Sequence, residues 1–308
     1  MLAYPSASFA VDRLQVTPAT RATPDAVIPL ERWRTRWILR AKIGGAERKL
    51  LFDTGGGLTL LHPDVLKAAN CQLWGRMTGF RMFGQRGDGP RCNAVDLNVA
   101  GIALRPPVLG PIDLGLLNPA DAELEGIASL NMFEGRTITL NLGEGEIIVE
   151  SPASLDERIR AMQPFRVRLK REVEAVALAV MAEVDTRRGP IWMELDSGNG
   201  GTVLIAKHNA ELFGLDPKEE GRQSVRFDVA DGVEIRSDHA FTPDMIMDGN
   251  LGMPFLHNWI ITVDLAAGRA WIARNPEAGT APSPVLPAAK KPVARVPEAD
   301  SGRSSPGM

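Results

Sequence analysis

The sequence contains few of the residues on which metal, thiol or membrane chemistry depends. It has two cysteines, one tyrosine and only four histidines, at positions 62, 208, 239 and 257, in 308 residues. The histidines are scattered and no His-Glu-x-x-His spacing occurs, so we expect no metal, no other cofactor and no metal hydrolase. No apolar run approaches the roughly 20 residues that cross a bilayer, which excludes an integral membrane segment.

Nucleophilic hydrolases lack support for a similar reason. There is no Gly-x-Ser-x-Gly elbow, and Cys71 and Cys92 bracket a glycine-rich stretch instead of accompanying a histidine. Two cysteines in a chain of this length fit a disulfide or two free thiols equally well. The first residues lack the charged and apolar regions of a secretory signal, although SASFA resembles the remnant of one. We expect a periplasmic or secreted protein, with a cytoplasmic location still open.

The charge balance excludes a polyanion partner. The formal net charge is −3, and basic residues cluster only between Arg32 and Lys42. Nucleic-acid binding usually needs a positive field over a whole face of the protein. We therefore expect no nucleic acid among the partners.

Composition divides the chain into a folded body and two extensions. Residues 276–308 are rich in proline, alanine and small polar residues, which predicts a disordered tail, and residues 1–29 predict a flexible N-terminal segment. Short apolar stretches between frequent turn residues make the body mainly β. From Trp33 to Ile43 apolar and basic residues alternate, which predicts one strand with a wet face.

Three short helices are predicted. Residues 62–69 carry a proline in a first helical turn, and residues 207–213 end before Gly214. Residues 154–164 begin with a capping box of Ser154 and Glu157. This third helix predicts a connector, residues 151–164, between an N-terminal domain, residues 30–150, and a C-terminal domain, residues 165–275.

The two predicted domains share an internal repeat. Residues 50–61 align with 193–204 at an offset of 143, while residues 126–133 align with 249–256, and 138–149 with 261–272, at an offset of 123. A constant register within each block indicates a duplicated unit whose first copy has 20 more residues between the blocks.

Each copy carries an acidic turn in the same place. Asp53, Thr54 and Gly55 follow one apolar run, and Asp196, Ser197 and Gly198 follow the other. A strand that enters a glycine turn presents the carboxylate at the end of the core, within reach of backbone donors. One such triplet arises easily by chance, but two in register are specific.

These motifs resemble the pepsin and retroviral-protease clan, closest in style to bacterial retropepsin-like aspartyl proteases. The resemblance covers most of residues 33–273, and residues 251–265 resemble the segment that crosses beneath each turn. It implies two homologous pepsin/retropepsin-like β-barrel lobes with pseudo-twofold symmetry and an active-site cleft between them. It also implies a monomer, because one chain supplies both turns.

The resemblance implies an aspartic endopeptidase, a hydrolase acting on an extended protein or peptide substrate. Asp53 and Asp196 would be catalytic. Two close carboxylates retain one proton between them, so one can activate a water while the other polarises the scissile carbonyl. Thr54, Gly55, Ser197 and Gly198 would support the active-site turns.

A glycine-rich stretch in the first copy matches the flap of this clan. It is predicted as a hairpin from Thr78 to Val99, and Phe80, Met82 and Phe83 would line it. The other interpretation is an ordinary surface hairpin. A disulfide between the two cysteines would join the base of this hairpin.

The sequence departs from the clan at three positions. The triplets are followed by Gly56 and Asn199 where a hydroxyl or alanine is common, and Ser129 stands where the second copy has Gly252. These departures favour a second interpretation, a catalytically inactive pepsin-like module that holds an extended peptide by strand addition.

Overall fold

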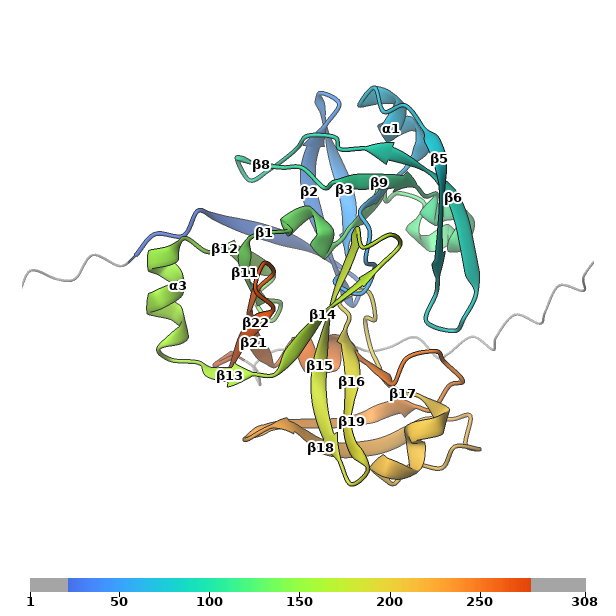
Figure 1. Cartoon of the computed structure of the whole chain (residues 1–308), viewed down its shortest axis with the longest axis vertical. Coiled ribbons are helices and arrows are strands. Elements are labelled where there is room, and N and C mark those ends of the chain that lie inside the picture. Colours follow the sequence, from blue (N-terminus) through green and yellow to red (C-terminus); the bar gives the residue numbers. More distant parts are fainter. Residues whose placement is uncertain (1–21, 278–308) are drawn as a thin grey trace, which may run out of the picture.

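The computed structural model describes residues 22–277 as a mainly β protein (Figure 1). Residues 1–21 and 278–308 lie outside the described part, and with them most of the predicted N-terminal segment and nearly all of the predicted tail. Strand β1 begins at Ala26, inside the segment predicted to be flexible, because residues 26–29 pair with strand β12. Between residues 22 and 277 no helix has the length and apolarity to span a membrane.

The strands form two sheets, and no closed barrel is seen within the described residues, so the barrel shape predicted for each lobe is not confirmed. The larger sheet has 15 strands. They are β1 Ala26–Trp33, β2 Arg36–Ile43, β3 Ala46–Phe52, β4 Leu60–Leu61, β5 Trp74–Phe80, β6 Arg86–Asn93, β7 Leu97–Val99, β8 Ile102–Leu104, β9 Val108–Pro111, β10 Gly126–Ala128, β11 Thr137–Asn141, β12 Glu146–Val149, β13 Gln163–Phe165, β21 Trp259–Asp264 and β22 Arg269–Arg274.

The smaller sheet has seven strands from the C-terminal half. They are β14 Val167–Glu172, β15 Ala177–Thr186, β16 Gly189–Leu195, β17 Val203–Ile205, β18 Gln223–Ala230, β19 Val233–Phe241 and β20 Gly249–Leu251. The helices are short: α1 Pro63–Ala68, α2 Leu114–Leu117, α3 Pro152–Ile159 and α4 Met253–Leu256, with 3-10 helices η1 Pro119–Asp121, η2 Leu130–Phe133 and η3 Lys207–Phe213.

The strand predicted from Trp33 to Ile43 is in fact two strands. Arg34 has φ of 59°, in the left-handed region, and with Thr35 it forms the turn between β1 and β2. The alternation of side chains continued across this turn in the sequence, so the pattern did not reveal it. The turn brings residues 33–36 to the centre of the molecule.

The same local arrangement occurs once in each half. Strand β10 runs parallel to β3 and antiparallel to β4, and β20 runs parallel to β16 and antiparallel to β17. Each short central strand therefore lies beside the end of the strand that leads into an aspartate. A single apolar core continues through both halves, with side chains such as Phe52, Leu195 and Leu251 fully or almost fully buried.

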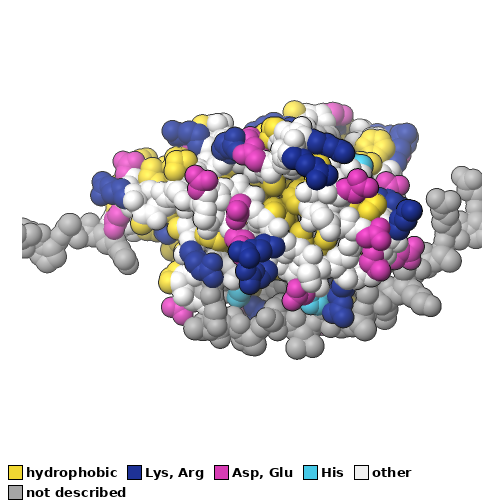
Figure 2. Space-filling model, turned by 90° about the horizontal axis from the view of Figure 1, so that it is seen from below, with side chains coloured by type: hydrophobic (Ala, Val, Ile, Leu, Met, Phe, Trp, Pro, Cys, Tyr) yellow, Lys and Arg dark blue, Asp and Glu magenta, His cyan; other side chains and the backbone are white. Residues whose placement is uncertain are grey.

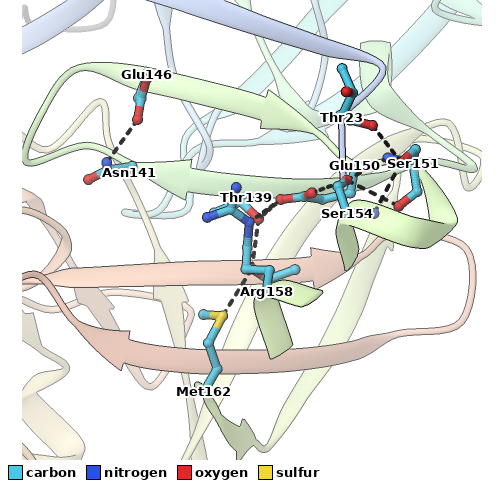
Figure 3. Close-up of polar contacts among 10 residues, drawn as sticks. Thr23, Thr139, Asn141, Glu146, Glu150, Ser151, Ser154, Arg158 and Met162 are labelled. Carbon is cyan, nitrogen blue, oxygen red and sulfur yellow. Dashed lines mark hydrogen bonds and ion pairs between the residues drawn. The ribbon is translucent and has the colours of Figure 1, made fainter. Parts of the chain in front are cut away.

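The halves are joined by hydrogen-bonded strands. Strand β11 pairs with β21, and in this register Thr139 lies opposite Thr262, with their hydroxyl oxygens 2.7 Å apart. Glu150, whose side chain is fully buried, accepts a hydrogen bond from the Thr139 hydroxyl at 2.6 Å and pairs with Arg158 of α3 (Figure 3). The connector helix is thus bound directly to the strands that link the halves.

Two of the predicted helices match the structure, and the third, predicted at residues 154–164, lies earlier in the chain. Helices α1 and η3 occupy the predicted segments, with His62 capping α1 and Gly214 ending η3 at φ of 71°. Helix α3 starts earlier than predicted and ends at Ile159, because Ser151 is its N-cap and Ser154 completes the capping box as the third residue. Ser154 is therefore inside the helix that it was predicted to cap.

Cys71 and Cys92 form a disulfide with their Cα atoms 5.8 Å apart, which settles the choice left open by the sequence. The bond joins the start of β5 to the end of β6. The β5–β6 hairpin spans residues 74–93, earlier than the predicted 78–99, because Leu97–Val99 forms strand β7 and pairs with β2 and β8.

Candidate functional site

Asp53 and Asp196 are placed by matching backbone contacts. Asp53 follows β3 and its N–H donates to the carbonyl of Ala128 at 3.0 Å, whereas Asp196 follows β16 and its N–H donates to the carbonyl of Leu251 at 3.0 Å. In both cases the acceptor belongs to the short parallel strand beside the turn. The two predicted site residues therefore occupy equivalent positions in their sheets.

The two turns are interlocked by four buried hydrogen bonds. The N–H of Thr54 donates to Oγ of Ser197 at 3.0 Å, and the N–H of Ser197 donates to Oγ1 of Thr54 at 2.9 Å. Each hydroxyl then donates to the opposite strand, at the carbonyls of Leu195 and Phe52, at 2.6 and 3.0 Å. Thr54 and Ser197 therefore tie the turn of one half to the turn of the other.

This interlock gives a first testable prediction. Thr54→Val deprives the buried N–H of Ser197 of its acceptor and the carbonyl of Leu195 of its donor, so we expect a loss of about 2–3 kcal/mol in the free energy of unfolding. Ser197→Ala should cost a similar amount, and the double variant about 1 kcal/mol less than the sum, because both changes break one network. Urea denaturation measures all three, and Thr78→Val, whose hydroxyl bonds Asp88 at the surface, is the matched control. Additive losses would contradict the interlock.

The glycines of the turns allow each carboxyl group to lie against the opposite turn. A methyl group on Gly55 would lie 2.6 Å from Cγ of Asp196, and a methyl group on Gly198 would lie 2.6 Å from Cγ of Asp53. Neither distance is compatible with a side chain larger than hydrogen. The two carboxyl groups and the two glycines thus form one compact unit, which we call the carboxyl pair.

Asp53 retains its proton over an unusually wide range of pH. Burial, followed by the neighbouring carboxyl of Asp196 and a hydrogen bond with it, raises the pKa of Asp53 well above its ordinary value, and Glu194 adds to the effect. The N–H of Gly55 donates to Oδ1 of Asp53 at 3.0 Å and partly opposes the rise. Asp53 can therefore act as a hydrogen-bond donor where an ordinary aspartate accepts.

Asp196 accepts three hydrogen bonds. Its Oδ1 accepts from the N–H groups of Gly198 and Asn199 at 2.8 and 3.2 Å, and its Oδ2 accepts from Nδ2 of Asn250 at 2.7 Å. The oxygen of Asn250 in turn accepts from Nδ2 of Asn199 at 2.8 Å. Asn250 is fully buried, and the sequence reasoning missed it.

Glu194 is a third carboxyl group beside the pair and was also missed. Burial and the nearby Asp196 raise the pKa of Glu194 to about 8, against a smaller opposite effect of Lys170. Glu194 lies opposite Asn250 in the register of β16 with β20, where the first half pairs Leu51 with Ile127. The second half thus has a polar pair where the first half has an apolar pair. A comparison of the two aligned repeats at these positions would have identified Glu194 and Asn250 as candidate site residues.

The three departures from the clan, at Gly56, Asn199 and Ser129, lie where each turn packs closely against the crossing segment of the same half. A methyl group on Gly56 would lie 2.6 Å from Oγ of Ser129, and a methyl group on Gly252 would lie 2.5 Å from the carbonyl oxygen of Asn199. The first half therefore combines glycine in the turn with serine in the crossing segment, and the second half combines asparagine with glycine. Among the described residues, Oγ of Ser129 is buried without a hydrogen-bond partner.

The β5–β6 hairpin contacts the C-terminal half directly. The N–H of Ile246 donates to the carbonyl of Met82 at 3.0 Å, and Cγ2 of Ile246 lies 3.3 Å from the position of a methyl group on Gly84. Phe80 and Phe83 expose 59% and 47% of their surface and so do not line a closed interior. The role of these residues as a flap stays a prediction.

Two cavities lie away from the carboxyl pair. One, of about 680 Å³, is lined by residues near the disulfide, and one, of about 510 Å³, is lined by residues of α3 and the strands beside it. No cluster of three or more potential metal ligands occurs between residues 22 and 277. On the face shown in Figure 2, acidic, basic and hydrophobic side chains are interspersed.

Comparison with known proteins identifies the fold but not a sequence family. No family model and no curated protein matches the chain. It is similar to the crystal structure of basic 7S globulin from soybean, with a TM-score of 0.52 and 11% identity over 80% of this chain and 94% of that one. It is also similar to conglutin gamma, a basic 7S globulin from lupine seeds, with a TM-score of 0.55 and 10% identity over 84% and 97%.

These comparisons correct the assignments made from the resemblance. The proteins that share the fold are globulins, and no match supports a bacterial retropepsin-like family, so that assignment was wrong. On the same finding, the prediction that the protein is an aspartic endopeptidase, a hydrolase and protease that carries out proteolysis, was wrong. A fold does not carry an activity with it. The chain therefore shares the fold of the basic 7S globulins.

Proposed function

We propose that this protein is a pepsin-like binding module that holds an extended peptide at the carboxyl pair without cleaving it. The observation that carries the proposal is the state of the pair. Protonated Asp53 is a donor, whereas Asp196 already accepts three hydrogen bonds. Such a pair suits the recognition of a carbonyl oxygen better than the activation of a water.

A duplicated architecture is part of the proposal. We infer two homologous lobes, residues 30–150 and 165–275, related by a pseudo-twofold axis and joined by the connector at 151–164. Support comes from contacts between residues at equivalent positions of the repeat. Thr54 bonds Ser197, 143 residues later, and Thr139 contacts Thr262, 123 residues later, which are the two offsets of the repeat. Contact between equivalent residues is what a twofold axis requires.

The peptide would bind through its backbone. The carbonyl oxygen of a peptide in extended conformation accepts the proton of Asp53, and the β5–β6 hairpin offers strand edges for backbone pairing. Phe80, Met82 and Phe83 lie near the end of that hairpin and are proposed to contact the side chains of the peptide. Because one chain supplies both aspartates, a monomer suffices.

The disulfide bears on the compartment. A bond between Cys71 and Cys92 persists in an oxidising environment, which supports the periplasm or secretion. Expression in a reducing cytosol followed by thiol counting, compared with export to the periplasm, distinguishes the two locations.

The test is selection of ligands from a displayed library of random linear 12-residue peptides. We expect peptides that bind wild-type protein and are recovered intact by mass spectrometry after prolonged incubation from pH 3 to 8. Asp53→Asn should weaken the binding of these peptides at least tenfold, because the amide replaces the acidic donor. Fluorescence anisotropy of labelled peptides measures the affinities.

Asp156→Asn, at an exposed position on α3, is the matched control and should leave the affinities unchanged. Thermal melts establish that each variant is folded. Failure to select any peptide, either with wild-type protein or with a variant whose β14–β15 turn is shortened, would overturn the proposed function, and so would cleavage that Asp53→Asn abolishes.

A further inference from the structure

The turn between β14 and β15, residues 173–176, leads into residues that contact the chain following Asp53. The N–H of Leu178 donates to the carbonyl of Gly57 at 2.9 Å, and Cβ of Ala177 lies 3.4 Å from the position of a methyl group on Gly57. Gly57 belongs to the turn that begins with Asp53. The start of β15 therefore lies beside the turn that carries Asp53.

This turn is longer than its counterpart in the first half. The β1–β2 turn contains only Arg34 and Thr35, and Thr35 contacts Gly200 much as Ala177 contacts Gly57. The β14–β15 turn has four residues. The added length carries Val173 to the β5–β6 hairpin, where its Cγ2 lies 3.3 Å from the position of a methyl group on Gly79. In Figure 1 this turn rises towards the part of the molecule that carries the hairpin.

Small apolar side chains of the turn fill a slot in the N-terminal half. Val173, Val176 and Ala177 pack with Leu58 and Met77, and with Leu60 and Val108 at the edge of the same cluster. The slot is thus formed by the hairpin and the chain that follows Asp53. A ligand at the carboxyl pair that extends beneath the hairpin would meet these valines.

An ion pair fixes the same turn to a basic hairpin. Glu174 pairs with Arg91, whose guanidinium lies 4.2 Å from the centre of the Trp74 ring. The segment from 74 to 93 contains four arginines, at positions 76, 81, 86 and 91, against one acidic residue, Asp88. Arg76 and Arg86 pair with Asp88, so Arg91 is the arginine that the turn contacts, and its charge favours an acidic partner.

The turn holds an unfavourable backbone conformation. Val173, Glu174 and Ala175 have φ of 49°, 58° and 67°, and none of them is glycine. The left-handed region is sterically strained for L-residues, most of all for a β-branched residue such as valine. The contacts with the hairpin therefore hold the turn in place, and a ligand that makes the same contacts without the strain competes well with it.

We propose that the β14–β15 turn is an internal stand-in for the ligand, and that the site takes an acidic peptide with a glutamate between small aliphatic residues. This proposal rests on the proposed peptide-binding function. The bound peptide replaces the turn, places its aliphatic side chains against Leu58 and Met77, and pairs its glutamate with Arg91. In wild-type protein the β14–β15 turn occupies the binding site, and displacement of the turn makes the site accessible to the peptide.

The test uses the full chain with residues 173–176 replaced by Asn-Gly, which forms the two-residue turn suited to a β-hairpin. The probe is a fluorescein-labelled peptide, Arg-Glu-Val-Glu-Ala-Val-Ala-Leu, that copies residues 171–178. We expect its Kd to be at least tenfold lower for the shortened protein than for wild type. Replacement of Arg187 and Arg188 by Asn-Gly in the β15–β16 turn is the matched control and should leave the wild-type Kd unchanged.

The charge of the ligand is tested separately. With the shortened protein, a probe in which lysine replaces the second glutamate should bind at least tenfold more weakly, and Arg91→Glu should reverse this preference. Equal binding of the original probe to the shortened and wild-type proteins would overturn the stand-in, and equal binding of the two probes would overturn the acidic preference.

The library selection separates this proposal from the function on which it rests. If folded shortened protein binds library peptides but not the copied peptide, the ligand class is wrong and peptide binding stands. If neither protein binds any peptide, both proposals fail.

Discussion

Gly252→Ala is expected to lower the free energy of unfolding by about 3 kcal/mol or more, because the added methyl group has no space to occupy. Its position lies 2.5 Å from the carbonyl oxygen of Asn199 and 2.6 Å from that of Thr202. Both are backbone atoms, so no side-chain rotation relieves the contact. The N–H of Gly252 also donates to the carbonyl of Thr202, so a shift of the segment breaks a hydrogen bond as well.

Urea denaturation with tryptophan fluorescence measures the loss, and Gly87→Ala is its matched control. A methyl group on Gly87 meets nothing within 4 Å, and its backbone does not require glycine. The control should change the free energy by less than about 1 kcal/mol. Comparable losses in the two variants would contradict the close approach that we describe at Gly252.

The first half offers the rescue that the second does not. Gly56→Ala brings a methyl group to 2.6 Å from Oγ of Ser129, which is a side-chain atom without a partner. The combination with Ser129→Gly removes that atom, so the double variant should recover most of the loss caused by Gly56→Ala. This recovery would show that turn and crossing segment are chosen as a pair in each half.

The repeat made the position of the aspartates predictable. The offset of 143 aligned Asp53 with Asp196, and the structure gives each of them an equivalent backbone acceptor on a neighbouring parallel strand. The strand break at Arg34 was not predictable, because the alternation of side chains passes through the turn unchanged. The helix cap at Ser151 was missed because two serines, three residues apart, form the box together.

The chemistry of the site was less accessible from the sequence than its position. Asn250 and Glu194 are polar residues next to apolar ones, so in the sequence they appear to interrupt a strand and not to belong to a site. Only the register of β16 with β20 shows that they face each other and reach Asp196. The contact of the turn at 173–176 with the β5–β6 hairpin likewise could not be predicted, because it depends on how the two halves are placed in space.

Stability is expected to fall as the pH rises from about 5 to 8, largely because of Glu194. Its pKa is 4.5 when unperturbed and about 8 in the folded protein, where it is buried beside Asp196. Below the lower value the carboxyl is neutral in both states and the full stability is present. Between the two values the unfolded chain ionises and the folded protein does not, so each step in pH favours unfolding until the folded pKa is passed.

Glu194→Gln isolates this contribution. The amide keeps the size of the side chain and removes the proton, so stability at pH 5 should remain close to that of wild type. At pH 8 the variant should be more stable by about 3 kcal/mol, below the limit of about 5 kcal/mol that the shift allows at 1.36 kcal/mol per unit.

Urea denaturation at pH 5, 6.5 and 8 gives the profile, and Glu47→Gln, at an exposed carboxylate, is the control that should follow wild type. Asp53 also has a raised pKa, so Glu194→Gln should reduce the slope without abolishing it. Addition of Asp53→Asn should remove most of what remains. A wild-type profile that is flat from pH 5 to 8 would contradict the buried, protonated Glu194, and with it the polar pair that distinguishes the second half of the site from the first.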